Sequence, residues 1–87
     1  MKRVHARTCN HWAYWRLYDW CNANDLLDVV GFVEEPGTGV YHASLWNGSV
    51  TEAYERYVEE NFERFLDELR TPGHGWTFEI EQGPVSQ

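Results

Sequence analysis

The segment from Val50 to Arg70 constrains the fold more than any other part of the sequence. Apolar residues recur in it at three- and four-residue intervals, at Val50, Tyr54, Tyr57, Val58, Phe62, Phe65, Leu66 and Leu69. This period predicts a single amphipathic helix with one apolar stripe. Ser49 and Glu52 match a capping box at its start, and Thr71-Pro72-Gly73 ends it. The rest of the chain has to supply a surface that covers the stripe.

Four other segments are predicted as β-strands. Apolar and polar residues alternate over residues 2–8 and 76–81, as they do in half-buried strands. Two β-rich runs, residues 26–35 and 40–46, flank the turn sequence Pro36-Gly37-Thr38-Gly39 and predict a hairpin.

The aromatic-rich segment after Asn10 is predicted as a second helix. Asn10 suits the N-cap position, and Asn22-Ala23-Asn24-Asp25 is a natural terminator, so the helix should end near Cys21 or Asn22. Its apolar face would consist of Ala13, Tyr14, Leu17, Tyr18, Trp20 and Cys21. A strand is also compatible with these aromatics, but the terminator favours the helix.

The resulting order, β-α-β-β-α-β, predicts a ferredoxin-like α+β fold in one domain, residues 1–87, with residues 83–87 as a tail. This fold pairs the first and last strands in an antiparallel sheet and lays both helices on one face. Arg3, His5 and Arg7 would then lie on the other face, beside Glu79 and Glu81. Such neighbouring strands of opposite charge are mildly favourable.

The net charge of −7 is unevenly spread, with +4 over residues 1–18 and −11 over residues 19–87. It disfavours direct binding to nucleic acid or to an anionic membrane. No run of residues is apolar enough to span a bilayer, and the N-terminus does not resemble a signal peptide. A cytoplasmic location is therefore expected.

Two cysteines raise the question of a metal. Cys9, His11, Cys21 and one further histidine are chemically able to bind zinc, but their spacing matches no zinc finger. Reduced, structural thiols are the simpler interpretation, and we expect no cofactor. The sequence also lacks phosphate-binding and nucleophile-elbow motifs, which predicts a protein that is not an enzyme.

The helix predicted over residues 50–70 carries acidic residues along one side. At about 100° per residue, five of them fall within about 60° of one direction: Glu52, Glu55, Glu59, Glu63 and Asp67. From Glu52 to Glu68 the charges lie about 3.4–4 Å apart, near the ~3.4 Å spacing of phosphates along a DNA strand. Such a stripe is either a solvated helix face or a surface for a basic, nucleic-acid-binding partner.

Trp12 and Trp15 lie off the apolar face of the first predicted helix. Exposed tryptophans are common anchors at protein interfaces, and they also stack on bases. We therefore include both in the predicted partner-binding set, with coverage by a sheet edge or loop as the alternative.

The uncovered sheet face offers a different chemistry. His5 and His42 are predicted neighbours there, with Arg3 and Arg7 beside them. Paired histidines and arginines are able to bind RNA or cleave it by acid–base catalysis. The alternative is a solvated face on which the arginines pair with Glu79 and Glu81.

In size, acidity and lack of a catalytic motif, the chain resembles the small phage-encoded anti-defence proteins, of which anti-CRISPR proteins are the best-known class. The resemblance implies a non-catalytic inhibitor or regulator in the host cytoplasm that binds a bacterial CRISPR immune complex. No motif carries it, so it assigns no residue. The alternatives are a domain that binds or cleaves RNA through the uncovered sheet face and a homodimeric assembly module.

Overall fold

The computed structural model describes residues 2–46, 52–71, 73 and 75–82. Within them the chain forms β1 (Lys2–Thr8), α1 (His11–Ala23), β2 (Val30–Glu35), β3 (Val40–Trp46), α2 (Glu52–Arg70) and β4 (Thr77–Gln82). The predicted order of elements is confirmed, and the protein is a small, compact α+β structure. Of the two helices described, neither combines the length and apolar character that a membrane span requires.

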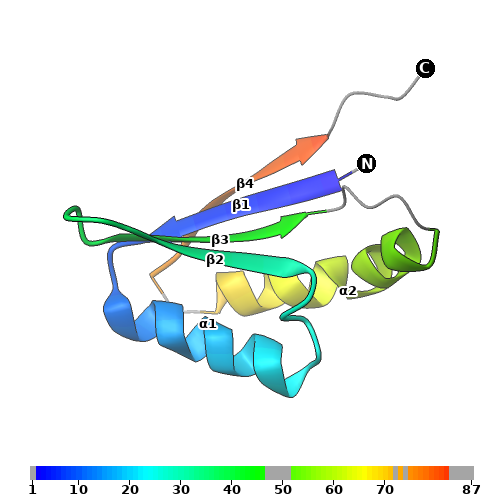
Figure 1. Cartoon of the computed structure of the whole chain (residues 1–87), viewed down its shortest axis with the longest axis horizontal. Helices are drawn as coiled ribbons and strands as arrows, with labels where there is room; N and C mark the ends of the chain where they lie inside the picture. Colours follow the sequence, from blue (N-terminus) through cyan, green and yellow to red (C-terminus); the bar gives the residue numbers. More distant parts are fainter. Residues whose placement is uncertain (1, 47–51, 72, 74, 83–87) are drawn as a thin grey trace.

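β1 is an interior strand of a four-stranded antiparallel sheet with the order β2-β3-β1-β4. It pairs with β3 on one side and with β4 on the other, so the first and last strands are neighbours, as expected. Both helices lie against the same face of the sheet (Figure 1). We call the opposite face, on which neither of the two described helices lies, the open face.

The core lies between the helices and the covered face of the sheet. Successive strand residues point to opposite faces, which places every second side chain against the helices. The largest fully buried side chains are Phe65, Leu17, Leu26, Leu45, Leu66, Val4, Val58 and Cys21. Phe65 and Leu66 come from the predicted stripe of α2, so the periodic pattern correctly identified the buried side of this helix.

α1 begins where the sequence predicts. Asn10 has an extended backbone, and its side-chain oxygen accepts hydrogen bonds from the backbone N–H groups of Trp12 and Ala13. These donors have no partner within the helix, which is why an asparagine suits the position. The helix ends two residues before Asp25, whose left-handed φ of 58° reverses the chain.

The segment 26–29 was wrongly predicted as the start of a strand. β2 begins only at Val30, and the backbone N–H groups of Val29 and Val30 bond to the carbonyl of Leu26 in a turn. The side chains of Leu26 and Val29 are buried all the same. The apolar run reflects burial beneath a turn, a pattern that periodicity alone does not distinguish from a strand.

β4 also differs from its prediction. It begins at Thr77, one residue later than expected, while the preceding Trp76 is buried. Ile80 lies opposite Val4 on the covered face, as predicted, but it remains 48% exposed. The reason is that β4 is an edge strand, and no strand among the described residues lies on its outer side. The predicted capping box cannot be compared, because Ser49 and the side chain of Glu52 lie outside the described residues.

Candidate functional site

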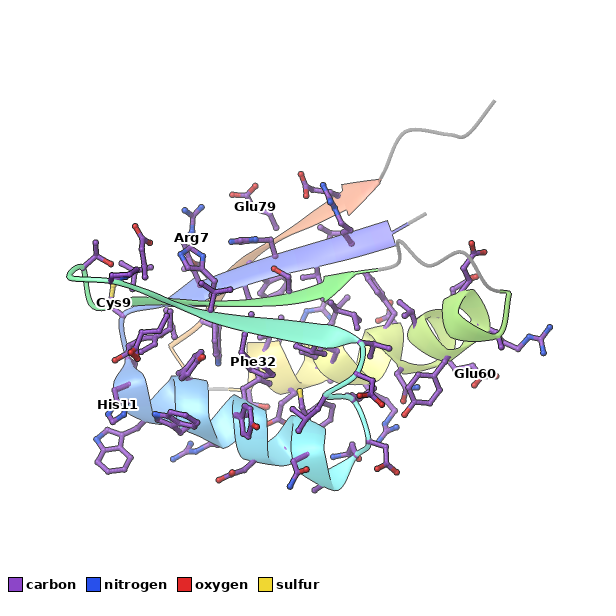
Figure 2. All side chains as sticks on the ribbon, in the orientation of Figure 1. Arg7, Cys9, His11, Phe32, Glu60 and Glu79 are labelled. Carbon is purple, nitrogen blue, oxygen red and sulfur yellow. The ribbon has the colours of Figure 1, made fainter. Side chains whose placement is uncertain are left out.

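The predicted acidic stripe of α2 is only partly exposed. Glu59, Glu63 and Asp67 are exposed, as is Glu60, which the prediction did not include. Figure 2 shows Glu60 on α2, away from the sheet. We call these four residues the acidic face.

Glu55, which the prediction also placed in the stripe, is half-buried. At about 100° per residue it lies only about 20° from Phe62, a core residue. It therefore sits at the border of the apolar stripe. The side chain of Glu52, the fifth predicted member, is outside the described part of the chain.

Two arginines of α2 are directed away from the centre of the acidic face. Arg64 donates hydrogen bonds to Asn61 and to Asn24 at the end of α1, and its guanidinium lies 5.8 Å from the centre of the Trp20 ring. Arg70 lies 3.6 Å from Asp67 and over the Phe78 ring of β4. Among the described residues, neither Glu59 nor Glu63 forms an ion pair.

Trp12 and Trp15 are both exposed, by 75% and 43%, which confirms their predicted position off the core. The Trp15 ring contacts those of Tyr14 and Tyr18, and the Tyr18 ring contacts Phe32 on β2. Phe32 is labelled between the sheet and α1 in Figure 2. These tryptophans thus lie on the β2 side of the molecule, whereas Arg70 of α2 reaches β4 at the opposite edge of the sheet. The structure does not bring Trp12 and Trp15 together with the acidic face.

On the open face, the predicted pairing of basic and acidic strands is confirmed. Arg3 lies 3.2 Å from Glu81, and Arg7 lies 3.2 Å from Glu79. Figure 2 shows Arg7 and Glu79 together on this side of the sheet. Both pairs are largely exposed and contribute little to stability. Each arginine is nevertheless neutralised, which weakens the open face as a phosphate-binding surface.

The predicted proximity of His5 and His42 is also confirmed. Nε2 of His5 lies 3.0 Å from Nδ1 of His42. The two ends of this pair are hydrogen-bonded as well: Ser44 Oγ is 3.2 Å from His5 Nδ1, and Glu35 Oε2 is 2.9 Å from His42 Nε2. We call the chain Ser44–His5–His42–Glu35 the histidine relay.

Glu35 was not recognised from the sequence as part of a site. The signal was present in the hairpin, because Glu35 is the last residue of β2 and pairs with Val40 across the turn. His42, two residues beyond Val40, lies on the same sheet face and diagonal to Glu35. Counting the strand pairs outward from the hairpin turn would have placed the Glu35 carboxylate beside the His42 imidazole.

A hollow of about 480 Å³ lies at one end of the histidine relay. The residues that matter for its chemistry are Arg3, His5, Asp28, Gly31, Ser44 and Glu81. Gly31, Ser44 and His5 come from three neighbouring strands, because Ser44 is in register with each of the other two. The hollow is therefore built on the open face itself.

The candidate zinc ligands are not brought together. Cys9 is exposed and Cys21 is buried in the core. His11 and Cys21, at opposite ends of α1, are about 15 Å apart along the helix axis at ~1.5 Å per residue. In the described part of the chain, no three His, Cys, Asp or Glu side chains are arranged to hold a metal ion. Burial, and to a lesser extent the charge of Glu68, raises the pKa of the Cys21 thiol to about 12.

Comparison with known proteins identifies no relative: no family model matches the sequence, and no curated protein or solved structure matches it significantly.

Proposed function

We propose that this protein is a non-catalytic inhibitor or regulator that presents its acidic face to a basic, nucleic-acid-binding partner. A bacterial CRISPR immune complex is the partner class that we favour, encountered in the cytoplasm of the bacterial cell. The observation that carries the proposal is the exposure of Glu59, Glu60, Glu63 and Asp67. They cover about 12 Å of the helix at ~1.5 Å per residue, close to one charge per ~4 Å, against the ~3.4 Å spacing of phosphates.

The arrangement of cations supports this proposal. α2 contains no lysine, and Arg64 bonds to Asn24 and Asn61 instead of covering a carboxylate. Like-charge neighbours such as Glu59 and Glu63 each cost the helix about 0.2–0.5 kcal/mol. Arg70 offsets part of this cost at Asp67, and the part that remains is recovered when a basic surface binds.

Trp12 and Trp15 are proposed as aromatic anchors at the edge of the same complex. Since they lie on the β2 side of α1, a partner that contacts both surfaces has to extend across the helical layer. The unpaired Cys9 and Cys21 accord with a reducing cytoplasm.

We further propose that the architecture is of the ferredoxin-like type. This assignment is supported by the β-α-β-β-α-β order, by β1 lying between β3 and β4, and by both helices covering one face of the sheet. The fold type alone implies no activity.

The proposal is tested with a panel of purified CRISPR effector complexes and their target DNA in gel-shift assays. The wild-type chain is expected to block DNA binding by at least one complex, about tenfold less effectively at 200 mM salt than at 50 mM, because steering between opposite charges is screened. The double substitution Glu59→Gln and Glu63→Gln should cause a similar loss.

The matched control removes two charges outside α2, through Asp28→Asn before β2 and Glu34→Gln on β2, both exposed. It should inhibit like the wild type. Equal losses in the two double variants would show that overall charge matters and the acidic face does not. Inhibition by none of the complexes would reject the proposed partner class.

A further inference from the structure

The histidine relay has a fixed hydrogen-bond direction when both rings are neutral. A carboxylate only accepts hydrogen bonds, so His42 must donate from Nε2 to Glu35 and accept at Nδ1. His5 then donates from Nε2 to His42 and accepts at Nδ1 from the hydroxyl of Ser44. In this state the Ser44 hydroxyl donates its hydrogen to His5, so towards the hollow its oxygen acts only as a hydrogen-bond acceptor.

One added proton reverses two of these bonds. With a proton on Nδ1, His42 donates to both Glu35 and His5, and His5 turns its remaining N–H towards Ser44. The Ser44 hydroxyl is released and becomes a donor to the hollow. A second proton would put N–H groups on both sides of the 3.0 Å contact between the rings and break it. The relay therefore accepts one added proton, and this proton changes the direction in which the Ser44 hydroxyl donates.

Gly31 leaves space for a ligand beside Ser44. A Cβ at this position would meet no atom within 4 Å, so nothing in the described chain fills the space. Glycine weakens a strand interior, and it often marks a place where a ligand approaches the backbone. The opening over Gly31 belongs to the same hollow as the Ser44 hydroxyl.

The charges around the hollow favour a cation. The charged groups near His5 on the open face come from each neighbouring element: Arg3 and Arg7 from β1, Glu79 and Glu81 from β4, Glu35 from β2, and Asp28 from the segment before β2. The two arginines pair with Glu81 and Glu79, and Glu35 is held by His42. Asp28 is left without an ion-pair partner among the described residues, at the rim of the hollow.

We propose that this hollow binds a guanidinium or primary ammonium group, and that one proton on the histidine relay opposes the binding. The ligand donates hydrogen bonds to Asp28 and to Ser44 while the relay is neutral. Protonation adds a positive charge next to the ligand and turns the Ser44 hydroxyl into a donor that faces another donor. The inference does not depend on the function proposed for α2.

The direct test is an NMR titration of the ¹⁵N-labelled full chain at pH 8.0 with methylguanidinium and with methylammonium. The amide signals of Gly31 and Ser44 are expected to shift in a saturable way. Tetramethylammonium at equal ionic strength carries the same charge without N–H donors and should produce no such shift. N-acetyl-arginine amide separates the two sources of the ligand: tighter binding than methylguanidinium indicates a protein side chain, and equal binding indicates a free small molecule.

Three variants make the proposal falsifiable. Gly31→Val adds apolar bulk inside the hollow, at a position where a Cβ would meet no atom within 4 Å, and should weaken binding at least tenfold, with folding checked by urea denaturation. Asp28→Asn should weaken ligand binding about fivefold. Glu34→Gln removes a nearby carboxylate that lies on β2 but on the covered face, and it should leave ligand binding unchanged. If Gly31→Val fails to fold, the Asp28→Asn comparison still decides the question.

The relay is tested by lowering the pH from 8.0 to 5.5, a range in which histidines titrate while carboxylates stay ionised. Wild-type affinity should fall about fivefold or more, and the double variant His5→Gln and His42→Gln, which has no imidazole left in the relay, should bind equally at the two pH values. Identical shifts with tetramethylammonium, no saturable shift, or a pH effect that persists in this double variant would each overturn the inference.

Discussion

Nε2 of His5 and Nδ1 of His42 lie 3.0 Å apart, although 37 positions separate the two residues in the sequence. Their contact arises because β1 and β3 are adjacent, with Arg7 paired to His42 and His5 paired to Ser44. The two imidazoles thus meet diagonally across the strands. With Glu35 at one end and Ser44 at the other, the contact fixes which nitrogen of each ring carries the hydrogen.

The first prediction is that both neutral rings adopt the Nε2–H form at pH 8. The carboxylate of Glu35 imposes it on His42, and His42 imposes it on His5. Long-range ¹H–¹⁵N correlation spectra of the imidazoles measure this form directly. Ser44→Ala should leave it unchanged, since the order is imposed from the Glu35 end. An Nδ1–H form on either ring at pH 8 would contradict the assigned direction.

The second prediction concerns Cys21, whose pKa is raised from 9.0 to about 12 by burial and then by Glu68. The folded state favours the neutral thiol, so this group's contribution to stability is complete below pH 9 and is lost as the pH rises from 9 to 12. Urea denaturation across that range should show a loss of stability that is smaller in Cys21→Ala.

The same burial predicts selective thiol chemistry. At pH 8 a disulfide reagent should modify exposed Cys9 rapidly, and Cys21 only after unfolding in urea. Modification of both thiols at similar rates in the folded chain would contradict the described burial of Cys21.

The third prediction is that Arg64→Ala destabilises the protein by about 1–3 kcal/mol. Arg64 joins the helices through Asn24 and also satisfies the side-chain oxygen of Asn61, which is buried. Arg64→Lys should recover only part of the loss, because an ammonium lacks the planar fork that reaches both amides. Urea denaturation provides the measurement. Arg16→Ala, an exposed change on α1, is the control and should stay within about 0.5 kcal/mol.

The fourth prediction is that Trp12→Ser changes stability by no more than about 0.5 kcal/mol but lowers binding to the partner at least tenfold. The reason is that Trp12 is already 75% exposed in the free protein. Thermal unfolding and the gel-shift assay measure the two effects. Sedimentation tests the alternative of a homodimeric assembly module. If the wild type is a dimer and Trp12→Ser is a monomer, this tryptophan belongs to the self-association interface.

The sequence was sufficient for the features that depend on local periodicity. Phe62, Phe65 and Leu66 recur at helical spacing and are buried, and the alternation of β1 places Arg3, His5 and Arg7 on the open face. The predicted pairing of β1 with β4 also followed, because charge complementarity and the order of elements agree.

Features that depend on exact borders were harder to predict. Glu55 was placed in the acidic stripe from the charges alone, and its position relative to Phe62 makes it a border residue. Leu26 and Val29 read as a strand because burial under a turn produces the same apolar run. The hollow over Gly31 depends on what is missing around a backbone position, and no sequence pattern reports that.

The position of β1 inside the sheet has a kinetic consequence. Arg7 pairs with Thr77, 70 positions further along the chain, so the sheet is complete only after residues far apart in sequence have met. Contacts of this range slow folding, since loop closure is unfavourable until the pairing forms. On the ribosome, β1 keeps an unpaired edge until residues 77–82 have been synthesised and released from the exit tunnel. During that interval the nascent chain exposes a strand edge to chaperones and to other unfinished chains.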